Sequence, residues 1–210
     1  MEIQFDNHDE RIKFYELMLE RNLKNLPRFP LPDGYRFVFF QKGDREQWIN
    51  IERSAKELTS YEQGVEVWNK FFGGKDHELT KRMVFIENKE GTKVATATAY
   101  YDIRGIDQSG DGWLHWVAVC REYQGKGLAK PLISYVLEIM QGLGYTHAKI
   151  PTQTTTWLAC KIYLDFGFRP IPKNAVHSHD GWRIVKTLTN HEALADFKPV
   201  TVDEMLVMKG

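Results

Sequence analysis

Hydrophobic and polar positions recur along this chain with two spacings, and each spacing predicts one kind of element. Short runs of β-branched and aromatic residues predict strands, and apolar residues three or four positions apart predict helices. Strands are expected at residues 35–40, 83–87, 94–101, 113–119, 148–154, 169–171 and 182–185. Helices are expected at residues 9–26, 44–55, 60–72, 128–142 and 157–166, with a helical turn at residues 191–197.

Residues that start or stop an element support these boundaries. Asp44 and Ser60 can each cap the helix that follows, because their side-chain oxygens can accept hydrogen bonds from its first backbone N–H groups. Residues 88–91 are expected to join two strands as a hairpin. Antiparallel hairpins come early in this order of elements and crossover helices come late, which predicts a mixed α/β sheet.

The composition argues against several classes of protein. The chain has 210 residues, with 28 Lys and Arg against 28 Asp and Glu, so its formal net charge is zero. A protein that binds nucleic acid needs a basic face, which this balance does not favour. The sequence shows no apolar run that could span a membrane and no signal-peptide core, and its 2 cysteines do not form a disulfide framework. We therefore expect a cytoplasmic protein that binds neither nucleic acid nor a membrane.

The most informative segment is a glycine-rich turn at residues 124–129, between an expected strand and an expected helix. Gly125 and Gly127 let the backbone turn tightly and approach a ligand closely. The first N–H groups of the following helix have no partner within the helix, and the helix dipole favours negative charge at that end. Strand, turn and helix start together predict a site for a phosphorylated cofactor.

Two common phosphate-binding motifs do not fit this turn. A Walker A loop needs Lys and then Ser or Thr after its last glycine, whereas Leu128 and Ala129 follow Gly127. A dinucleotide-binding fingerprint needs a third glycine, and Lys130 stands in its place. A purely structural turn before a helix remains an alternative.

The pattern that does fit is Gln or Arg, two residues, Gly, one residue, and then Gly or Ala. Gln124, Gly127 and Ala129 satisfy this pattern, and the apolar Val119 ends the preceding strand. Residues 163–168 match a Tyr-x-x-x-Gly-Phe sequence at the end of the next helix. In these motifs and in the order of its elements, the chain resembles the GNAT superfamily of acyl-CoA N-acyltransferases.

The resemblance is strongest over residues 112–170, and it implies a fold. This fold is a GNAT-like mixed, mostly antiparallel central sheet flanked by helices, within the α/β (α+β) class. It has a V-shaped splay between the fourth and fifth expected strands, where a thioester can enter. The acetyltransferase domain is then expected at residues 34–189, between an N-terminal helical extension at residues 1–33 and a C-terminal tail at residues 190–210.

The resemblance also implies acetyl-CoA as the co-substrate, without a metal. The pyrophosphate would lie on backbone amides of the glycine-rich turn, and the pantetheine arm would pair with the strand that ends at Val119. Thr156 stands where the family often has Asn, and its hydroxyl can still form hydrogen bonds and cap the following helix. The residues expected to bind the cofactor are Val117, Val119, Gln124, Gly125, Lys126, Gly127, Leu128, Ala129 and Thr156.

Two residues are candidates for catalysis. Tyr163 matches the position of the family's tyrosine and would protonate the departing thiolate, although its ring could instead only pack on the core. His115 lies where several family members place a base that faces the substrate, and a histidine is suited to accept a proton near pH 7. Alternatively, His115 is a hydrogen-bonded residue of the sheet. A backbone N–H within residues 116–119 would polarise the thioester carbonyl.

Aromatic residues near these candidates are expected to bind the acceptor, namely Trp113, Tyr100 and Trp157. A tight apolar pocket favours the primary amine of a small molecule as the acceptor. Two alternatives stay open: the amine of a protein or peptide, and a catalytically inactive acyl-CoA-binding sensor. Dimers are frequent in the family, so a homodimer is also considered.

Four further residues that often carry chemistry are expected to have no such role here. Cys120 and Cys160 are expected to be buried thiols, because no Cys–His–acid arrangement accompanies them. His177 and His179 are expected in a surface loop between the last two strands, because no cluster of Cys or carboxylates accompanies them as it would at a metal site.

Overall fold

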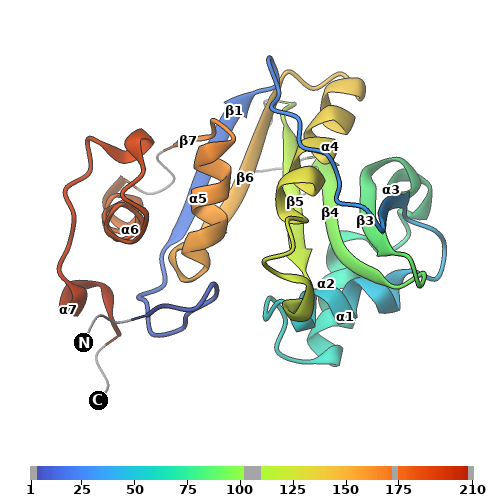
Figure 1. The fold of residues 1–210 in the computed structure, drawn as a ribbon, viewed down its shortest axis with the longest axis horizontal. Coiled ribbons are helices and arrows are strands. Elements are labelled where there is room, and N and C mark those ends of the chain that lie inside the picture. The colour runs from blue at the N-terminus through green and yellow to red at the C-terminus, as the bar shows by residue number, and fades with distance from the viewer. Residues whose placement is uncertain (1–3, 102–109, 172–174, 208–210) are drawn as a thin grey trace. The chain divides into compact units, whose positions relative to one another are not determined.

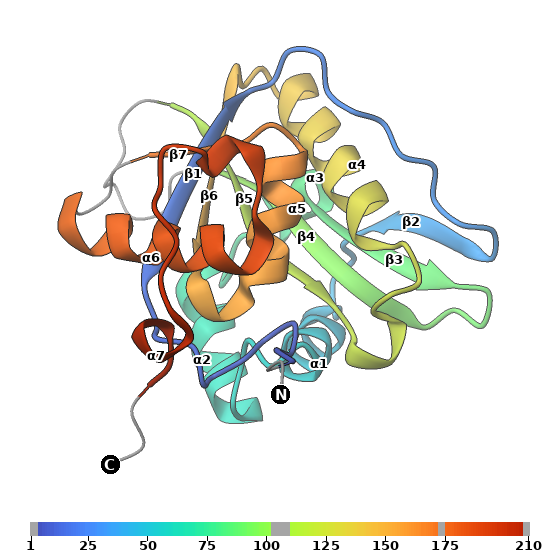
Figure 2. The ribbon, with the colours of Figure 1, turned by 60° about the vertical axis from the view of Figure 1, so that its left-hand side comes forward.

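The computed structural model of the chain describes residues 4–101, 110–171 and 175–207. The chain divides into two compact units, one of them Asn22–Ala148 and the other made of Met1–Arg21 with Lys149–Gly210. Each unit holds a cluster of buried hydrophobic side chains. Figures 1 and 2 label the helices and strands of both units.

The unit Asn22–Ala148 contains antiparallel strands in the order β2-β3-β4-β5. They are β2 (Tyr35–Phe39), β3 (Met83–Asn88), β4 (Lys93–Tyr101) and β5 (Gly112–Val119). β3 and β4 form the expected hairpin, in which the N–H of Gly91 donates to the carbonyl oxygen of Asn88 over 3.0 Å. The strands expected in these places are confirmed.

The same unit contains helices α1 (Arg45–Ser54), α2 (Tyr61–Phe71), α3 (Asp76–Arg82) and α4 (Ala129–Gly142), with a 3₁₀ turn η1 (Arg121–Tyr123). α1 and α2 gather at one face of the sheet, and α4 crosses the other face (Figure 2). Ser60 caps α2 as expected, because its hydroxyl accepts a hydrogen bond of 3.1 Å from the N–H of Gln63. Asp44 precedes α1 without capping it, since its carboxylate accepts from the N–H of Gln41 at 2.7 Å. Periodicity does not reveal α3, which buries Leu79 alone.

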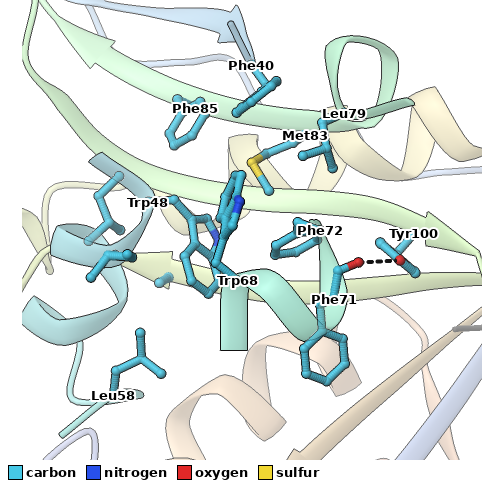
Figure 3. Close-up of a cluster of buried hydrophobic side chains, with 13 residues drawn as sticks. Phe40, Trp48, Leu58, Trp68, Phe71, Phe72, Leu79, Met83, Phe85 and Tyr100 are labelled. Atoms are coloured by element: carbon cyan, nitrogen blue, oxygen red, sulfur yellow. Dashed lines mark hydrogen bonds between the residues drawn. The ribbon is translucent and has the colours of Figure 1, made fainter. Parts of the chain in front are cut away.

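The core between α1, α2 and the sheet is dominated by aromatic rings (Figure 3). The ring centroids of Trp48 and Trp68 lie 5.4 Å apart, and Phe72 packs edge-on against Trp48 at 5.4 Å. Tyr100 of β4 donates its hydroxyl hydrogen to the carbonyl oxygen of Phe71 over 2.7 Å, which links the sheet to the end of α2. Full burial of a phenylalanine-sized side chain contributes about 1.5–3 kcal/mol. These rings therefore hold α1 and α2 on the sheet.

The other unit contains strands in the order β6-β1-β7. They are β1 (Glu16–Asn22), β6 (His147–Gln153) and β7 (Arg169–Pro170). Its helices are α5 (Trp157–Asp165), α6 (Ala175–Thr189) and α7 (Val202–Met205), with 3₁₀ turns η2 (Thr154–Thr156) and η3 (Glu192–Leu194). The strands expected at residues 148–154 and 169–171 and the helix expected at residues 157–166 are confirmed. Of the helical turn expected at residues 191–197, only η3 is present.

The helix expected at residues 9–26 is wrong, because Glu16–Asn22 form strand β1. The side chains of Leu17, Met18 and Leu19 are 0%, 7% and 0% exposed, so both faces of the strand are covered. A strand covered on both faces has a continuous apolar run, which periodicity alone cannot separate from a helix. β1 pairs antiparallel with β7, so this part of the N-terminal segment belongs to a sheet.

The strand expected at residues 182–185 is also wrong, because α6 contains these residues. The window Trp-Arg-Ile-Val is rich in residues that favour strands, and this local preference misled the assignment. Over a longer window, Ser178, Trp182 and Val185 are buried three or four positions apart, which is the spacing of a helix face.

α6 packs closely against β1 at a glycine. A Cβ atom added to Gly181 would lie 2.8 Å from Cδ2 of Leu17, a distance that real contacts do not reach. The extent of α6 also corrects the expected position of His177 and His179, which lie in this helix and not in a loop between strands.

Two expectations about the organisation of the chain stay predictions, namely the splay between the fourth and fifth expected strands and the domain boundaries. Within the described ranges, the chain has no helix that combines the length and the hydrophobicity needed to cross a membrane.

Candidate functional site

The glycine-rich turn lies between η1 and α4, and both of its glycines have left-handed backbones. The φ angles of Gly125 and Gly127 are 75° and 78°, values that residues with a Cβ rarely adopt. A Cβ at Gly125 would meet nothing within 4 Å, and one at Gly127 would lie 3.7 Å from Cγ of Pro32. The space beside both glycines is therefore open to a ligand. Leu128 is the N-cap of α4 and Ala129 is its first residue, so the free N–H groups of the helix start lie in the same turn.

Two side-chain contacts join the turn to the residues that precede it. The side-chain amide of Gln124 donates to the carbonyl oxygen of Val119 over 3.1 Å. The ammonium nitrogen of Lys126 lies 4.5 Å from the centroid of the Tyr123 ring, a cation–π contact. Pro131 falls in the first turn of α4, where its missing N–H costs no hydrogen bond within the helix.

β5 carries a β-bulge shortly before the turn. The register changes between the pairs His115 with Thr98 and Ala118 with Thr96, so two residues of β5 oppose one residue of β4. Trp116 lies in the bulge with a φ of 53°, which is uncommon for any residue other than glycine. A bulge leaves one residue outside the regular ladder, and such a residue can offer a backbone donor to a ligand.

The bulge also changes the face on which the expected cofactor-binding residues of β5 lie. Val119 pairs with Ala95 and is buried. Since the bulge adds one residue to the strand, Val117 and Val119 point to the face opposite that of His115. Simple alternation without a bulge would place all three on one face.

Three expected active-site residues share the face of the sheet beneath α1 and α2. Trp113 lies opposite Tyr100 and His115 lies opposite Thr98, and residues opposed in an antiparallel pair point to the same face. The centroid of the His115 ring lies 5.4 Å from that of Phe71 at the end of α2. The structure therefore brings Trp113, His115 and Tyr100 together.

Tyr100 is more deeply engaged than a residue that only lines a pocket. Its side chain is 0% exposed, and its hydroxyl donates to the carbonyl of Phe71 and accepts a hydrogen bond of 2.9 Å from Nζ of Lys75. Burial, with a hydrogen bond to Tyr101, raises the pKa of Tyr100 above its ordinary value. The protein thus engages this hydroxyl as donor and as acceptor, and the role expected for Tyr100 in binding an acceptor stays a prediction.

Tyr163 and Thr156 belong to the other unit, where α5 holds the first and begins just after the second. Tyr163 is 5% exposed, and its ring lies edge-on to that of Phe168 with 6.2 Å between the centroids. The cap expected from Thr156 is wrong, because its hydroxyl donates to the carbonyl oxygen of Gln153 over 3.2 Å and makes no bond to the helix.

Trp157 is the first residue of α5 in the same unit. Its indole N–H donates to the carbonyl oxygen of Asp6 over 2.8 Å and so ties α5 to the N-terminal segment. The role expected for Trp157 in binding an acceptor stays a prediction.

Neither cysteine is an activated nucleophile. Cys160 is buried, and burial raises the pKa of its thiol to about 12. Cys120 is half-buried, and burial raises its pKa as well. The thiolate is the reactive form of cysteine, so both residues are poor nucleophiles near neutral pH. The expectation of a buried thiol is confirmed for Cys160, whereas Cys120 is only half-buried.

The sequence analysis missed Glu52 of α1, which is 0% exposed. Among the described residues, neither of its carboxylate oxygens has a hydrogen-bond partner. Burial raises the pKa of Glu52 well above its ordinary value, and the negative charge of Glu57 adds to this effect. The signal that could have revealed Glu52 is its position four residues after Trp48, on the apolar stripe of the helix.

The turn fits a phosphorylated ligand such as acetyl-CoA. The open space beside Gly125 and Gly127 admits a close approach to the backbone, and the start of α4 supplies N–H groups. Lys126 adds a positive charge to the same turn.

A family model described as the acetyltransferase (GNAT) family matches residues 45–168. The match covers more than half of the chain and includes α1, the bulged strand, the glycine-rich turn and α5. This chain therefore belongs to the GNAT acetyltransferase family, a family of acyltransferases.

Solved structures share the fold at low sequence identity. A GCN5-related N-acetyltransferase from Sphaerobacter thermophilus superposes with a TM-score of 0.60 and 16% identity, over 77% of this chain and 50% of that one. A GNAT-family acetyltransferase from Colwellia psychrerythraea gives a TM-score of 0.57 and 16% identity, over 76% of this chain and 53% of that one. The chain thus spans about half the length of these two proteins. The likeness confirms the expected fold, a mixed α/β structure with a mostly antiparallel sheet flanked by helices.

Proposed function

We propose that this chain is an acetyl-CoA-dependent N-acetyltransferase that transfers an acetyl group directly to the primary amine of a small molecule. The observation that carries the proposal is the turn at residues 124–129. Its left-handed glycines and the start of α4 would form an anion site, and the bulged strand β5 precedes this turn. Membership of the GNAT family supports acetyl transfer as the reaction class.

The backbone would hold the co-substrate at two places. The N–H groups from Gly125 to Ala129 would bind the pyrophosphate, helped by the dipole of α4 and the charge of Lys126. The strand from Val117 to Val119 would pair with the pantetheine arm. When bound, acetyl-CoA supplies the acetyl group as a thioester that a neutral amine can attack.

Three tasks then fall to residues of this chain. A backbone N–H of the bulge at Trp116 would stabilise the negative charge that develops on the carbonyl oxygen. Tyr163 would donate its phenolic proton to the leaving sulfur. The amine must lose a proton before it attacks, and His115 is the candidate that the sequence offers for this task.

The aromatic surroundings of Trp113, His115 and Tyr100 support a compact acceptor over an extended one. A groove for a protein or peptide would have to be open and would often carry acidic side chains to receive a lysine. A small-molecule amine is therefore the preferred acceptor, and the homodimer and the cytoplasmic location stay predictions.

Titration of the purified protein with CoA, followed by a thiol-release assay with acetyl-CoA, tests the proposal. The panel of acceptors contains small amines and a lysine-containing peptide. Turnover with small amines supports the proposal, and turnover with the peptide alone would replace it by acetylation of protein amines. CoA binding without any turnover would favour an acyl-CoA sensor, and the absence of CoA binding would overturn all three functions.

A further inference from the structure

Buried polar atoms without partners recur on one side of the sheet in the unit Asn22–Ala148. In the part of the chain that the structure describes, they include the carboxylate oxygens of Glu52, the hydroxyls of Thr96 and Thr98, and the indole N–H groups of Trp48, Trp113 and Trp116. Folded proteins leave few polar groups in this state, because a buried group without a partner is costly. Unpartnered groups that share one side of a sheet are candidates for contact with a ligand.

The register of β4 and β5 places these groups on one face of the sheet. Thr96 opposes Ala118 and Thr98 opposes His115, so both hydroxyls point to the side on which His115 lies. Tyr100 continues the same row two residues later and belongs to the aromatic cluster beneath α1 and α2 (Figure 3). The unpartnered groups therefore coincide with the face where sequence analysis expected the acceptor.

α1 holds Glu52 beside the bulged part of β5. One turn before Glu52, the Trp48 ring packs with its centroid 5.3 Å from that of Trp116 in the bulge. At the end of α1, Ser54 accepts a hydrogen bond of 3.0 Å from the N–H of Arg121, just after β5. Glu52 lies between these two points of attachment, next to the strand that would receive the thioester.

Within the ranges that the structure describes, the charged and titratable groups that act on Glu52 include no positive partner. Glu57, which follows α1, is negative, and Cys120 after β5 interacts with Glu52 as a neutral thiol. On the same sheet face lie His115 of β5 and Tyr100 of β4, while α2 presents aromatic and aliphatic side chains. A buried carboxylate in these surroundings is best compensated by a cationic ligand.

We propose that Glu52 binds the amine nitrogen of the acceptor and accepts its proton before acetyl transfer. In this step the ammonium R–NH₃⁺ and the Glu52 carboxylate become the amine R–NH₂ and a carboxylic acid, so protons and charge balance. Burial favours the transfer, because it raises the pKa of a carboxyl group and lowers that of an ammonium group. The inference rests on the proposed function and assigns to Glu52 the task for which His115 was the candidate.

The single carboxylate also indicates the class of acceptor. One buried carboxylate compensates one positive charge, so the site suits a monoamine. A polyamine or a lysine-rich peptide would bring further charges into surroundings of low polarity at a high cost in desolvation. The indole N–H groups and the threonine hydroxyls can donate to oxygen atoms of the same molecule. A monoamine that carries hydroxyl groups is the acceptor that fits best.

The variant Glu52→Gln tests this role, because it keeps the shape of the side chain and removes its basicity. With a monoamine acceptor, we expect its turnover to fall by about 10²–10⁴-fold, while its dissociation constant for CoA stays unchanged. The limb of the pH profile of kcat/KM that belongs to Glu52 should disappear. Glu46→Gln changes an exposed carboxylate of the same helix and should keep the wild-type turnover and pH profile.

Two further comparisons keep the inference falsifiable. Glu52→Asp retains an ionisable group and should retain the pH limb at reduced turnover. His115→Gln removes the competing base; if it abolishes the pH limb while Glu52→Gln keeps it, the inference is overturned. It is also overturned if Glu52→Gln folds and turns over monoamines like the wild type, or if spermidine is a better acceptor than hydroxylated monoamines.

Calorimetric titration of monoamines in the presence of CoA separates this inference from the proposed function. The wild type should bind a monoamine at least about tenfold more tightly than Glu52→Gln, since tenfold corresponds to the loss of one good ionic hydrogen bond. A wild type that binds CoA and a monoamine but transfers no acetyl group would overturn the proposed function and leave the amine site supported. A wild type that binds no monoamine of the panel would overturn the amine site.

Discussion

The side-chain amide of Gln124 is joined to the backbone of Val119 by a hydrogen bond of 3.1 Å. This bond fixes the glycine-rich turn to the end of the bulged strand, so the two expected contacts with CoA are held at a constant distance. Replacing Gln124 by Ala should weaken CoA binding about 2- to 12-fold, which corresponds to about 0.5–1.5 kcal/mol for one hydrogen bond. Calorimetric titration with CoA measures the effect. Gln141→Ala is the control, because its amide binds the carbonyl of Leu23, remote in sequence from the turn, and it should bind CoA like the wild type.

The left-handed backbone of Gly127 should be essential for CoA binding. In Gly127→Val, a branched side chain strains the backbone at a φ of 78° and occupies the space that a pyrophosphate needs. We expect CoA binding to be lost in a titration followed by thermal shift. Gly91→Val introduces the same strain at a φ of 81° in the β3–β4 hairpin, and there a similar loss of stability should leave CoA binding intact. Equal CoA binding by both variants would refute the assignment of the turn.

The phenol of Tyr163 should matter for turnover more than for binding. Tyr163→Phe keeps the ring that packs against Phe168 and removes only the hydroxyl. We expect kcat to fall by about 10²-fold or more for the loss of a general acid, with a small change in the dissociation constant for CoA. Steady-state kinetics and titration measure the two quantities. Tyr145→Phe, which loses a hydroxyl bonded to Arg82, should retain kcat; an unchanged kcat in Tyr163→Phe removes Tyr163 as the acid.

Gly181 should be a position where even a methyl group destabilises the fold. In Gly181→Ala the new Cβ would lie 2.8 Å from Leu17 and 2.9 Å from Tyr15, so α6 must shift away from β1. We expect the free energy of unfolding to fall by about 1–3 kcal/mol, as overpacked cores do. Gly142→Ala, at a helical glycine with nothing within 4 Å of its Cβ, should be neutral or slightly stabilising. Urea denaturation compares the two variants.

The raised pKa of Glu52 should appear in the pH dependence of stability. The folded chain holds this proton more tightly than the unfolded chain, so the free energy of unfolding falls as pH rises above the unfolded value of 4.5 and levels off beyond the raised folded pKa. Glu52→Gln removes this loss, so its stability relative to the wild type should grow with pH over that window. Urea denaturation from about pH 4.5 upward, across the range where an unperturbed glutamate would ionise, measures the difference. Parallel stability curves would show that Glu52 is not buried as described, and Glu46→Gln should show no such growth.

Sequence patterning alone predicted the parts of the fold that local chemistry determines. Residues 88–91 marked the β3–β4 hairpin, and Ser60 marked the start of α2. The glycines of the turn at residues 124–129 indicated both the strand before them and the helix after them. In each case a particular backbone conformation needs particular residue types, so the signal lies within a few positions.

β1 and α6 could not be assigned in this way, because tertiary contacts decide them. Leu17 to Leu19 are apolar in sequence whether they form a buried strand or a helix. Trp182 to Val185 favour a strand locally, yet they are buried at helical spacing together with Ser178. The choice depends on which surfaces cover them, and a single sequence does not contain that information.

In the candidate site too, some residues could be predicted from the sequence and others could not. The turn, His115 and Tyr163 could be named from motif positions, whereas Glu52 could not. A glutamate in the middle of a polar-looking helix is normally exposed. Its place four residues after Trp48 is the one hint in the sequence, and the packing of Trp48 against Trp116 of the sheet shows that this helix face is covered. The register of β5 could not be predicted from the sequence either, because the composition of the strand does not show where a bulge adds one residue.

The extra residue at Trp116 shifts the alternation of side chains along β5 by one position. Before it, odd-numbered positions such as Trp113 and His115 face α1 and α2; after it, the even-numbered Ala118 does. A relative that lacks this insertion would align correctly on one side of Trp116 and be displaced by one position on the other. Roles transferred along this strand by counting residues would then exchange the acceptor face for the opposite one, so each half of β5 has to be matched separately.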